Sequence, residues 1–215
     1  MFKKILIFAF LSLLLSACDS KPKFKPLAAQ SNVVILGDSL TYGTGAKEGE
    51  DYATLLAGST GWNVVNAGVP GNKSSDGLER LPDLLAEHDN GAQKIHLLVI
   101  ELGGNDFLKQ IPEAETTSNL KAILLQAKAK SIQTVLLAIP EFSPVGAAFG
   151  NLSDHPLYEA LAKETDTPLV ENVFSEVLAK NALKADAIHP NAEGYRQVEA
   201  DLREAFIKLG FLSRQ

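Results

Sequence analysis

Short apolar runs alternate with longer amphipathic segments along most of the chain. Five runs rich in branched aliphatic residues predict buried strands, at Asn32–Leu36, Trp62–Asn66, Ile95–Leu102, Ile132–Ile139 and Pro168–Glu171. Segments with helical patterns separate or follow them, at Asp51–Ala57, Ser74–Glu87, Ala114–Lys130, His155–Lys163, Phe174–Leu178 and Ala192–Leu209. Alternating strands and helices predict a parallel sheet that is covered by helices on both faces. We therefore expect a three-layer α/β/α sandwich with about five parallel strands.

The first residues have the pattern of an export signal. Lys3 and Lys4 precede an apolar stretch, Ile5–Leu15, which is too short to span a bilayer. The sequence Leu15-Ser16-Ala17-Cys18 resembles a bacterial lipobox, so we expect cleavage before Cys18 and lipidation of this single cysteine. An ordinary secretory signal with an incidental cysteine is the alternative.

The lipobox interpretation divides the chain into three parts. Residues 1–17 would be a signal peptide, residues 18–31 a lipidated cysteine with its tether, and residues 32–215 one domain. The protein would be anchored in the bacterial cell envelope, on the periplasmic side of the inner membrane or at the outer membrane.

Composition and charge narrow the classes of function. Hydrophobic residues make up 46% of the 215 residues, enough for a sizeable core. A net charge of −6 without a Lys/Arg cluster gives no support for nucleic-acid binding. Gly43-Thr44-Gly45 lacks the spacing of the common phosphate-binding loops, and no histidine-rich motif indicates a metal. We expect neither a cofactor nor a metal.

Glycine-rich and polar motifs follow the predicted strands where each strand ends. They are Gly37-Asp38-Ser39-Leu40, Asn66-Ala67-Gly68-Val69-Pro70-Gly71 and Gly103-Gly104-Asn105-Asp106, and Asp186-Ala187-Ile188-His189-Pro190 lies near the end of the chain. Ligand sites of parallel α/β sheets form at the carboxyl ends of the strands, so these motifs are expected to meet. A hydroxyl presented there, with a histidine and a carboxylate, predicts serine-based acyl transfer.

Ser39 is the expected nucleophile, His189 the general base and Asp186 the acid that orients it. Because Asp186 precedes His189 by three residues, one tight turn can place its carboxylate against the ring. His155 is the competing base, since Asp154-His155-Pro156 mimics the last motif. Adjacent side chains diverge, however, so Asp154 is poorly placed to orient that ring. The alternatives are that Ser39 caps a helix and that Asp186 is a solvated loop residue.

The four motifs, in this order, resemble the SGNH (GDSL-type) hydrolase family over roughly residues 32–209. The resemblance is closest to bacterial esterases, thioesterases, lysophospholipases and arylesterases. It implies a flavodoxin-like fold and an oxyanion hole made by the N–H groups of Ser39 and Gly71 and the side-chain amide of Asn105. Gly71 and Asn105 could instead be turn residues. Asp38 and Asp106 are expected to bond nearby backbone amides.

The resemblance implies hydrolysis of small acyl esters or thioesters, with lysophospholipids among the candidate substrates, through an acyl-enzyme. One alternative is an O-acetyl esterase acting on envelope glycans, and another is a non-catalytic binding lipoprotein. We expect Leu108, Ile111, Phe142 and Phe149, from the loops 107–112 and 141–152, to line an acyl pocket. An open polar groove would favour glycans. The alternative for these loops is that their phenylalanines pack onto the core.

Overall fold

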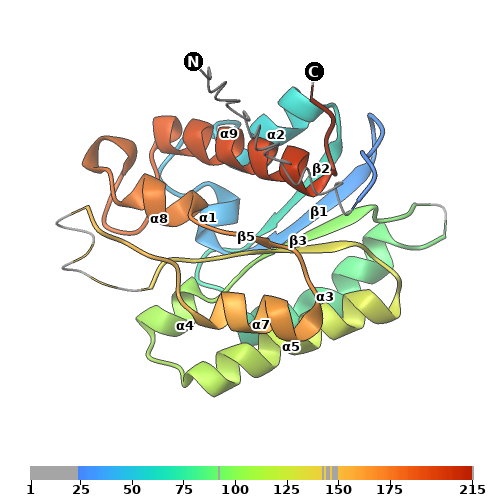
Figure 1. Cartoon of the computed structure of the whole chain (residues 1–215), viewed down its shortest axis with the longest axis horizontal. Coiled ribbons are helices and arrows are strands. Elements are labelled where there is room, and N and C mark those ends of the chain that lie inside the picture. The colour runs from blue at the N-terminus through green and yellow to red at the C-terminus, as the bar shows by residue number, and fades with distance from the viewer. Residues whose placement is uncertain (1–23, 92, 142, 144–145, 147–149, 215) are drawn as a thin grey trace, which may run out of the picture.

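One parallel sheet forms the centre of the computed structural model, which describes residues 24–91, 93–141, 143, 146 and 150–214. Among these residues, the strands lie in the order β2-β1-β3-β4-β5, and all paired neighbours run parallel (Figure 1). Their bounds are Asn32–Gly37 for β1, Asn63–Gly68 for β2, Leu97–Glu101 for β3, Thr134–Leu137 for β4 and Leu169–Val170 for β5. The expected flavodoxin-like sheet is confirmed.

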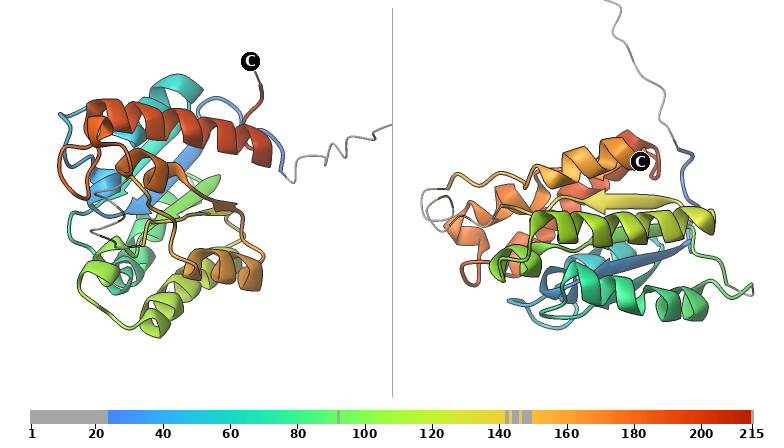
Figure 2. Two further views of the ribbon diagram at one scale, coloured as in Figure 1. Left: turned by 60° about the vertical axis from the view of Figure 1, so that its left-hand side comes forward. Right: turned by 90° about the horizontal axis from the view of Figure 1, so that it is seen from below.

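Helices cover both faces of the sheet (Figures 1 and 2). One layer contains α2 (Tyr52–Thr60), α8 (Val173–Leu178) and α9 (Ala192–Leu209), and the other contains α3 (Ser74–His88), α5 (Glu113–Ala129) and α7 (Leu157–Thr165). Three further helices are short. The helices α1 (Ser39–Tyr42) and α4 (Gly104–Leu108) follow β1 and β3, and the 3₁₀ turn η1 (Asn181–Leu183) follows α8. Among the described residues, no helix is long and apolar enough to cross a bilayer.

Local signals explain where the elements begin and end. The side chain of Asn191 accepts the N–H of Gly194 and caps α9, and Gly210 ends that helix with φ 95°. The apolar run Ile95–Leu102 is longer than β3, and Pro168–Glu171 is longer than β5. The edge strand β5 is short and pairs with β4 over two residues only. The apolar pattern marks burial, and buried residues continue beyond the hydrogen-bonded part of each strand.

The strand order creates a crevice between the ends of two strands. The chain passes from β1 outward to β2 and then returns to the other side of β1 to form β3. At this reversal the connections leave in opposite directions, which opens a binding crevice outside the carboxyl ends of β1 and β3. Ser39 follows β1 and Asn105 follows β3, so both lie at this crevice.

Candidate active site

Ser39 is the first residue of α1 and is separated from β1 by Asp38 alone. Asp38 caps this helix, and its Oδ1 accepts the N–H of Leu40 at 3.0 Å. The N–H of Thr41 donates to the Glu101 carboxyl at 3.1 Å. Among the described residues, the N–H of Ser39 itself has no hydrogen-bond partner. The turn therefore leaves one backbone donor beside the hydroxyl available to a ligand.

Three side chains form a hydrogen-bonded chain that begins at Ser39. Its Oγ lies 3.0 Å from Nε2 of His189, and Nδ1 of His189 lies 2.7 Å from Oδ2 of Asp186. The other carboxylate oxygen of Asp186 accepts the N–H groups of Ile188 and His189, each at 2.8 Å. With Nδ1 protonated, Nε2 can accept the serine proton.

The carboxylate of Asp186 is held ionised. Burial acts to raise its pKa, but hydrogen bonds from the His189 ring and from the N–H groups of Ile188 and His189 outweigh it. The net effect holds the pKa of Asp186 below its usual value. An ionised acid at this position stabilises an imidazolium.

The Gly43-Thr44-Gly45 segment packs against the turn that carries His189. A Cβ on Gly45 would lie 2.3 Å from the Pro190 carbonyl oxygen and 2.8 Å from Cβ of Ala185, and Gly45 has φ 100°. The hydroxyl of Tyr195 donates to the Thr44 carbonyl at 2.8 Å and ties the segment to α9. The absence of a side chain at Gly45 therefore lets the Ser39 and His189 segments lie close together.

His155 lies in a different environment from His189. Its ring stacks on Phe107 with centroids 4.3 Å apart, and its Nδ1 accepts the N–H of Leu157 at 3.3 Å. Asp154 accepts the N–H of Asn172 at 2.6 Å and does not orient the adjacent imidazole. The histidine that meets Ser39 is His189.

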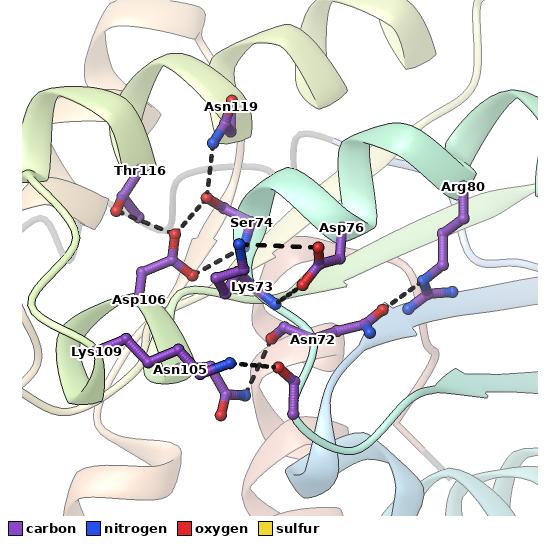
Figure 3. Close-up of polar contacts among 11 residues, drawn as sticks. Asn72, Lys73, Ser74, Asp76, Arg80, Asn105, Asp106, Lys109, Thr116 and Asn119 are labelled. Atoms are coloured by element: carbon purple, nitrogen blue, oxygen red, sulfur yellow. Dashed lines mark hydrogen bonds and ion pairs between the residues drawn. The ribbon is translucent and has the colours of Figure 1, made fainter.

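The second and third motifs meet beside the serine turn (Figure 3). The amide of Asn105 donates to Oδ2 of Asp38 at 2.9 Å and to the Asn72 carbonyl at 3.0 Å, so both of its N–H bonds are engaged. Gly71, with φ 82°, directly precedes Asn72, and its carbonyl accepts the Lys109 ammonium at 3.3 Å. Gly68 has a packing role, because a Cβ there would lie 2.2 Å from the backbone nitrogen of Tyr42.

Asp106 joins three helices next to Asn105. Its buried carboxylate accepts the N–H of Ser74 at 2.8 Å and also the Ser74 hydroxyl. The Thr116 hydroxyl donates to it at 3.2 Å, and the amide of Asn119 donates to the Ser74 hydroxyl at 3.1 Å (Figure 3). These bonds fix the start of α3 against α4 and α5, and with it the loop that carries Gly71.

Arg80 is a site residue that the sequence analysis missed. Its guanidinium donates to the carbonyls of Gly37 and Ala67, each at 2.8 Å, and to Oδ1 of Asn72 at 2.9 Å. Burial lowers its pKa from the usual value. Arg80 thus ties the ends of β1 and β2 to the loop that meets Asn105. An arginine in an amphipathic helix looks in sequence like an ordinary solvated residue.

Known proteins share this architecture and sequence. The model of the GDSL-like Lipase/Acylhydrolase family matches residues 35–197. The chain belongs to this family. It is 34% identical over 171 residues to Thioesterase 1/protease 1/lysophospholipase L1 of Escherichia coli K12, covering 77% of this chain and 78% of that one. Esterase TesA of Pseudomonas aeruginosa is 33% identical over 189 residues, with 83% and 89% covered.

Solved structures agree with this family membership. A crystal structure of TesA superimposes with a TM-score of 0.72 at 29% identity, over 83% of this chain and 99% of that one. This GDSL-type hydrolase is therefore an ester-hydrolysing enzyme. Within the described ranges, no three His, Cys, Asp or Glu side chains come together as a metal site.

A cavity of about 350 Å³ opens beside Ser39 and His189 in this hydrolase. Most of its wall is apolar and is formed by Leu40, Leu108, Ile139, Pro140, Leu152, Leu178, Ala187 and Ile188. Glu141, Ser143, Asn181 and Lys184 add polar groups.

The cavity differs in part from the pocket that the sequence analysis expected. Leu108 lines it, whereas Ile111 is not among the described lining residues. Ile111 lies in the turn after α4, where its N–H donates to the Asp106 carbonyl at 2.9 Å. Phe142 and Phe149 lie outside the described residues. The remaining apolar wall comes from α1, the segment after β4, Leu152, the end of α8 and the His189 turn.

Proposed function

We propose that this hydrolase cleaves acyl esters and thioesters, with lysophospholipids among its candidate substrates, through an acyl-enzyme on Ser39. The observation that carries this proposal is the apolar cavity directly beside the Ser39–His189 hydrogen bond. An acyl chain placed in the cavity would bring its carbonyl carbon to the serine oxygen. The reaction needs no cofactor.

In the first half of the reaction, Ser39 Oγ attacks the carbonyl carbon while Nε2 of His189 takes its proton. Asp186 stabilises the imidazolium through its hydrogen bond to Nδ1. The tetrahedral intermediate then collapses, and His189 returns the proton to the leaving alcohol or thiol. In the second half, water attacks the acyl-enzyme with His189 again as the base, and the acid is released.

The oxyanion that forms during attack would be bound by three donors. The free N–H of Ser39 is one, and the N–H of Gly71 and the amide of Asn105 complete the set. Because both N–H bonds of the Asn105 amide are engaged, the amide would exchange one acceptor, Asp38 or Asn72, for the oxyanion. This exchange makes the interaction specific to the charged intermediate.

The apolar wall favours acyl chains over the acetyl groups of glycans. An acetyl group would leave most of the cavity unfilled. A longer acyl chain would fill it and displace water from the apolar side chains. The test is a panel of nitrophenyl esters of increasing acyl length, acyl thioesters, lysophospholipids and acetylated sugars, with Ser39→Ala as the control. A clear preference for acetylated sugars would contradict the proposal.

We expect Leu108→Ala to change selectivity for acyl length. Leu108 lines the cavity and is itself partly exposed, so its truncation should leave the fold intact. Each buried methylene contact is worth about 0.8 kcal/mol, roughly a factor of four in kcat/KM. The ratio of kcat/KM between medium-chain and acetyl esters should therefore fall several-fold.

Leu125→Ala is the matched control for this measurement, because Leu125 is an exposed leucine on α5 and does not line the cavity. It should leave the ratio unchanged. Equal losses on all chain lengths in Leu108→Ala would show that Leu108 supports the fold and does not select the acyl chain.

We further propose that Cys18, which lies outside the described residues, is lipidated and anchors the enzyme. The sequence at Leu15–Cys18 supports this proposal. The described part of the tether is docked on the domain: Phe24 stacks on Phe211 with centroids 4.3 Å apart, and its N–H donates to the Leu209 carbonyl at 3.2 Å. The six residues from Cys18 to Phe24 reach at most about 20 Å, so the lipid would hold the domain close to the membrane.

The docked tether and the active site lie at opposite ends of α9. Phe24 meets Leu209, the last residue of the helix, whereas His189 precedes its first residue, Ala192. A helix of 18 residues is about 27 Å long. An anchored enzyme would therefore present its cavity away from the attachment point, towards substrates that arrive through water.

We expect Cys18→Ser to move the enzyme from the membrane fraction to the soluble fraction. Stable anchoring needs two or more acyl chains, and removal of the thiol removes their attachment. Activity on a water-soluble ester should persist, because the tether docks far from Ser39. Intact mass and fractionation are the measurements. A wild-type protein whose mature chain carries an unmodified Cys18 would contradict the anchor.

A further inference from the structure

A buried carboxylic acid lies directly beside the turn that carries the nucleophile. Glu101 is the last residue of β3, is fully buried, and is paired in register with Gly37. Its Oε2 accepts the N–H of Asp38 at 3.3 Å, the N–H of Thr41 at 3.1 Å and the Thr41 hydroxyl at 2.6 Å. Ser39 lies between these two residues, so one carboxyl oxygen holds the turn on both sides of it.

The contact extends into α2 and depends on a glycine. The Thr41 hydroxyl donates to Glu101 and lies 2.7 Å from the hydroxyl of Tyr52, which is also fully buried. A Cβ on Gly37 would lie 1.9 Å from Oγ1 of Thr41 and 2.7 Å from Oε2 of Glu101. The first glycine of the serine motif is therefore required for the carboxyl group to reach the turn.

The environment of Glu101 favours the neutral acid. Burial raises its pKa well above the usual value, and the neighbouring Asp38 carboxyl adds to the shift. All three donors meet Oε2, whereas Oε1 is buried without a partner among the described residues. In the neutral acid, the proton would sit on Oε1, because Oε2 accepts all three hydrogen bonds. A neutral acid avoids an unpaired buried charge and adds no negative charge near the developing oxyanion.

We propose that Glu101 is a positioning residue for the nucleophile, acting as a neutral acid that fixes the turn at Asp38 and Thr41. It holds Ser39 Oγ at hydrogen-bond distance from His189, and it leaves the Ser39 N–H as the free donor of the turn. The proposal rests on the proposed role of Ser39. A purely structural role would lower the stability of the fold alone. The proposed role also predicts slower reaction of Ser39 in a variant that remains folded.

The test compares Glu101→Ala with Glu101→Gln. Glu101→Ala should lower kcat on the order of 100-fold, because small misplacement of a reacting group has effects of this size. KM should change little, since Glu101 does not line the cavity. The rate at which a serine-reactive phosphonate labels Ser39 should fall with kcat. In Glu101→Gln the amide oxygen can accept the same three bonds, so kcat should stay within a few-fold and the pH profile should be retained.

Leu85→Ala is the control for lost stability, because Leu85 is a buried residue of α3 near its end distant from the serine turn. Leu85→Ala should lower the melting temperature. At temperatures well below the unfolding transition, its kcat should equal that of the wild type. Two results would overturn the proposal: a kcat loss in Glu101→Ala no larger than in Leu85→Ala, or a Glu101→Gln variant as slow as Glu101→Ala.

A second pair of variants tests the same contact if Glu101→Ala fails to fold. Thr41→Val removes the hydroxyl donor at nearly constant shape, and Thr41→Ser keeps it. We expect slower labelling of the serine and a lower kcat in Thr41→Val, with recovery in Thr41→Ser. Equal kcat in both would overturn the proposal. The role of Ser39 is judged separately: if Ser39→Ala hydrolyses the ester as fast as the wild type, the proposed function itself fails.

Discussion

Ser39→Ala and His189→Ala should each lower kcat by several orders of magnitude, and the double variant should be hardly slower than either. The hydroxyl oxygen and Nε2 are 3.0 Å apart and would act on the same proton. Once one partner is removed, the other has no function in the attack, so the two losses do not add. The residual rate would come from the oxyanion donors and substrate binding.

The measurement is steady-state hydrolysis of a nitrophenyl ester, supported by labelling with a serine-reactive phosphonate. His155→Ala is the matched control, because it removes the same type of side chain from a stack with Phe107. It should leave kcat within a few-fold. The triad assignment is wrong if His155→Ala abolishes activity while His189→Ala does not.

Much of the fold could be predicted because its signals are local. The last helix has the bounds that its cap at Asn191 and its glycine at Gly210 predict. The apolar runs mark the strands because a parallel sheet with both faces covered must be apolar throughout. Strand order and register depend on contacts between distant segments, and here the resemblance to a known family was needed.

The supporting contacts of the site could not be predicted in the same way. Glu101 lies within the apolar run Ile95–Leu102 and meets Thr41, 60 residues earlier in the chain. Arg80 lies among ordinary helix residues, and its acceptors are backbone carbonyls, which leave no trace in sequence. Hydrogen bonds between distant segments have no local pattern.

The cavity wall was only partly predictable for a related reason. Ile139 follows β4 and Leu178 ends α8, and in sequence these apolar residues do not differ from core residues. Leu108 could be predicted because it lies two residues after the motif Gly103-Gly104-Asn105-Asp106. Ile111, three residues further, belongs to a turn whose N–H binds Asp106. In this loop, proximity in sequence to the Asn105 motif therefore identifies Leu108 alone as a wall residue.

Asn105→Ala should lower kcat by about 10²- to 10³-fold, the usual loss when one oxyanion donor is removed. In the free enzyme the amide donates to Asp38 and Asn72, and in the proposed mechanism it exchanges one of them when the oxyanion forms. An interaction made only in the transition state changes kcat and not KM, so KM should be nearly unchanged. Affinity for a phosphonate transition-state analogue should fall in parallel with kcat.

Asn119→Ala is the matched control, because it deletes the same amide from a neighbouring contact, the hydrogen bond to the Ser74 hydroxyl. That bond supports the helices behind the loop and does not face Ser39. If Asn105 binds the oxyanion, Asn119→Ala should lose stability but retain kcat within a few-fold. Similar kcat values in the two variants, or a phosphonate affinity that survives Asn105→Ala, would show that the Asn105 amide only ties Asp38 to the Asn72 loop. The amide would then have a structural role, and the oxyanion would be left to the backbone N–H groups.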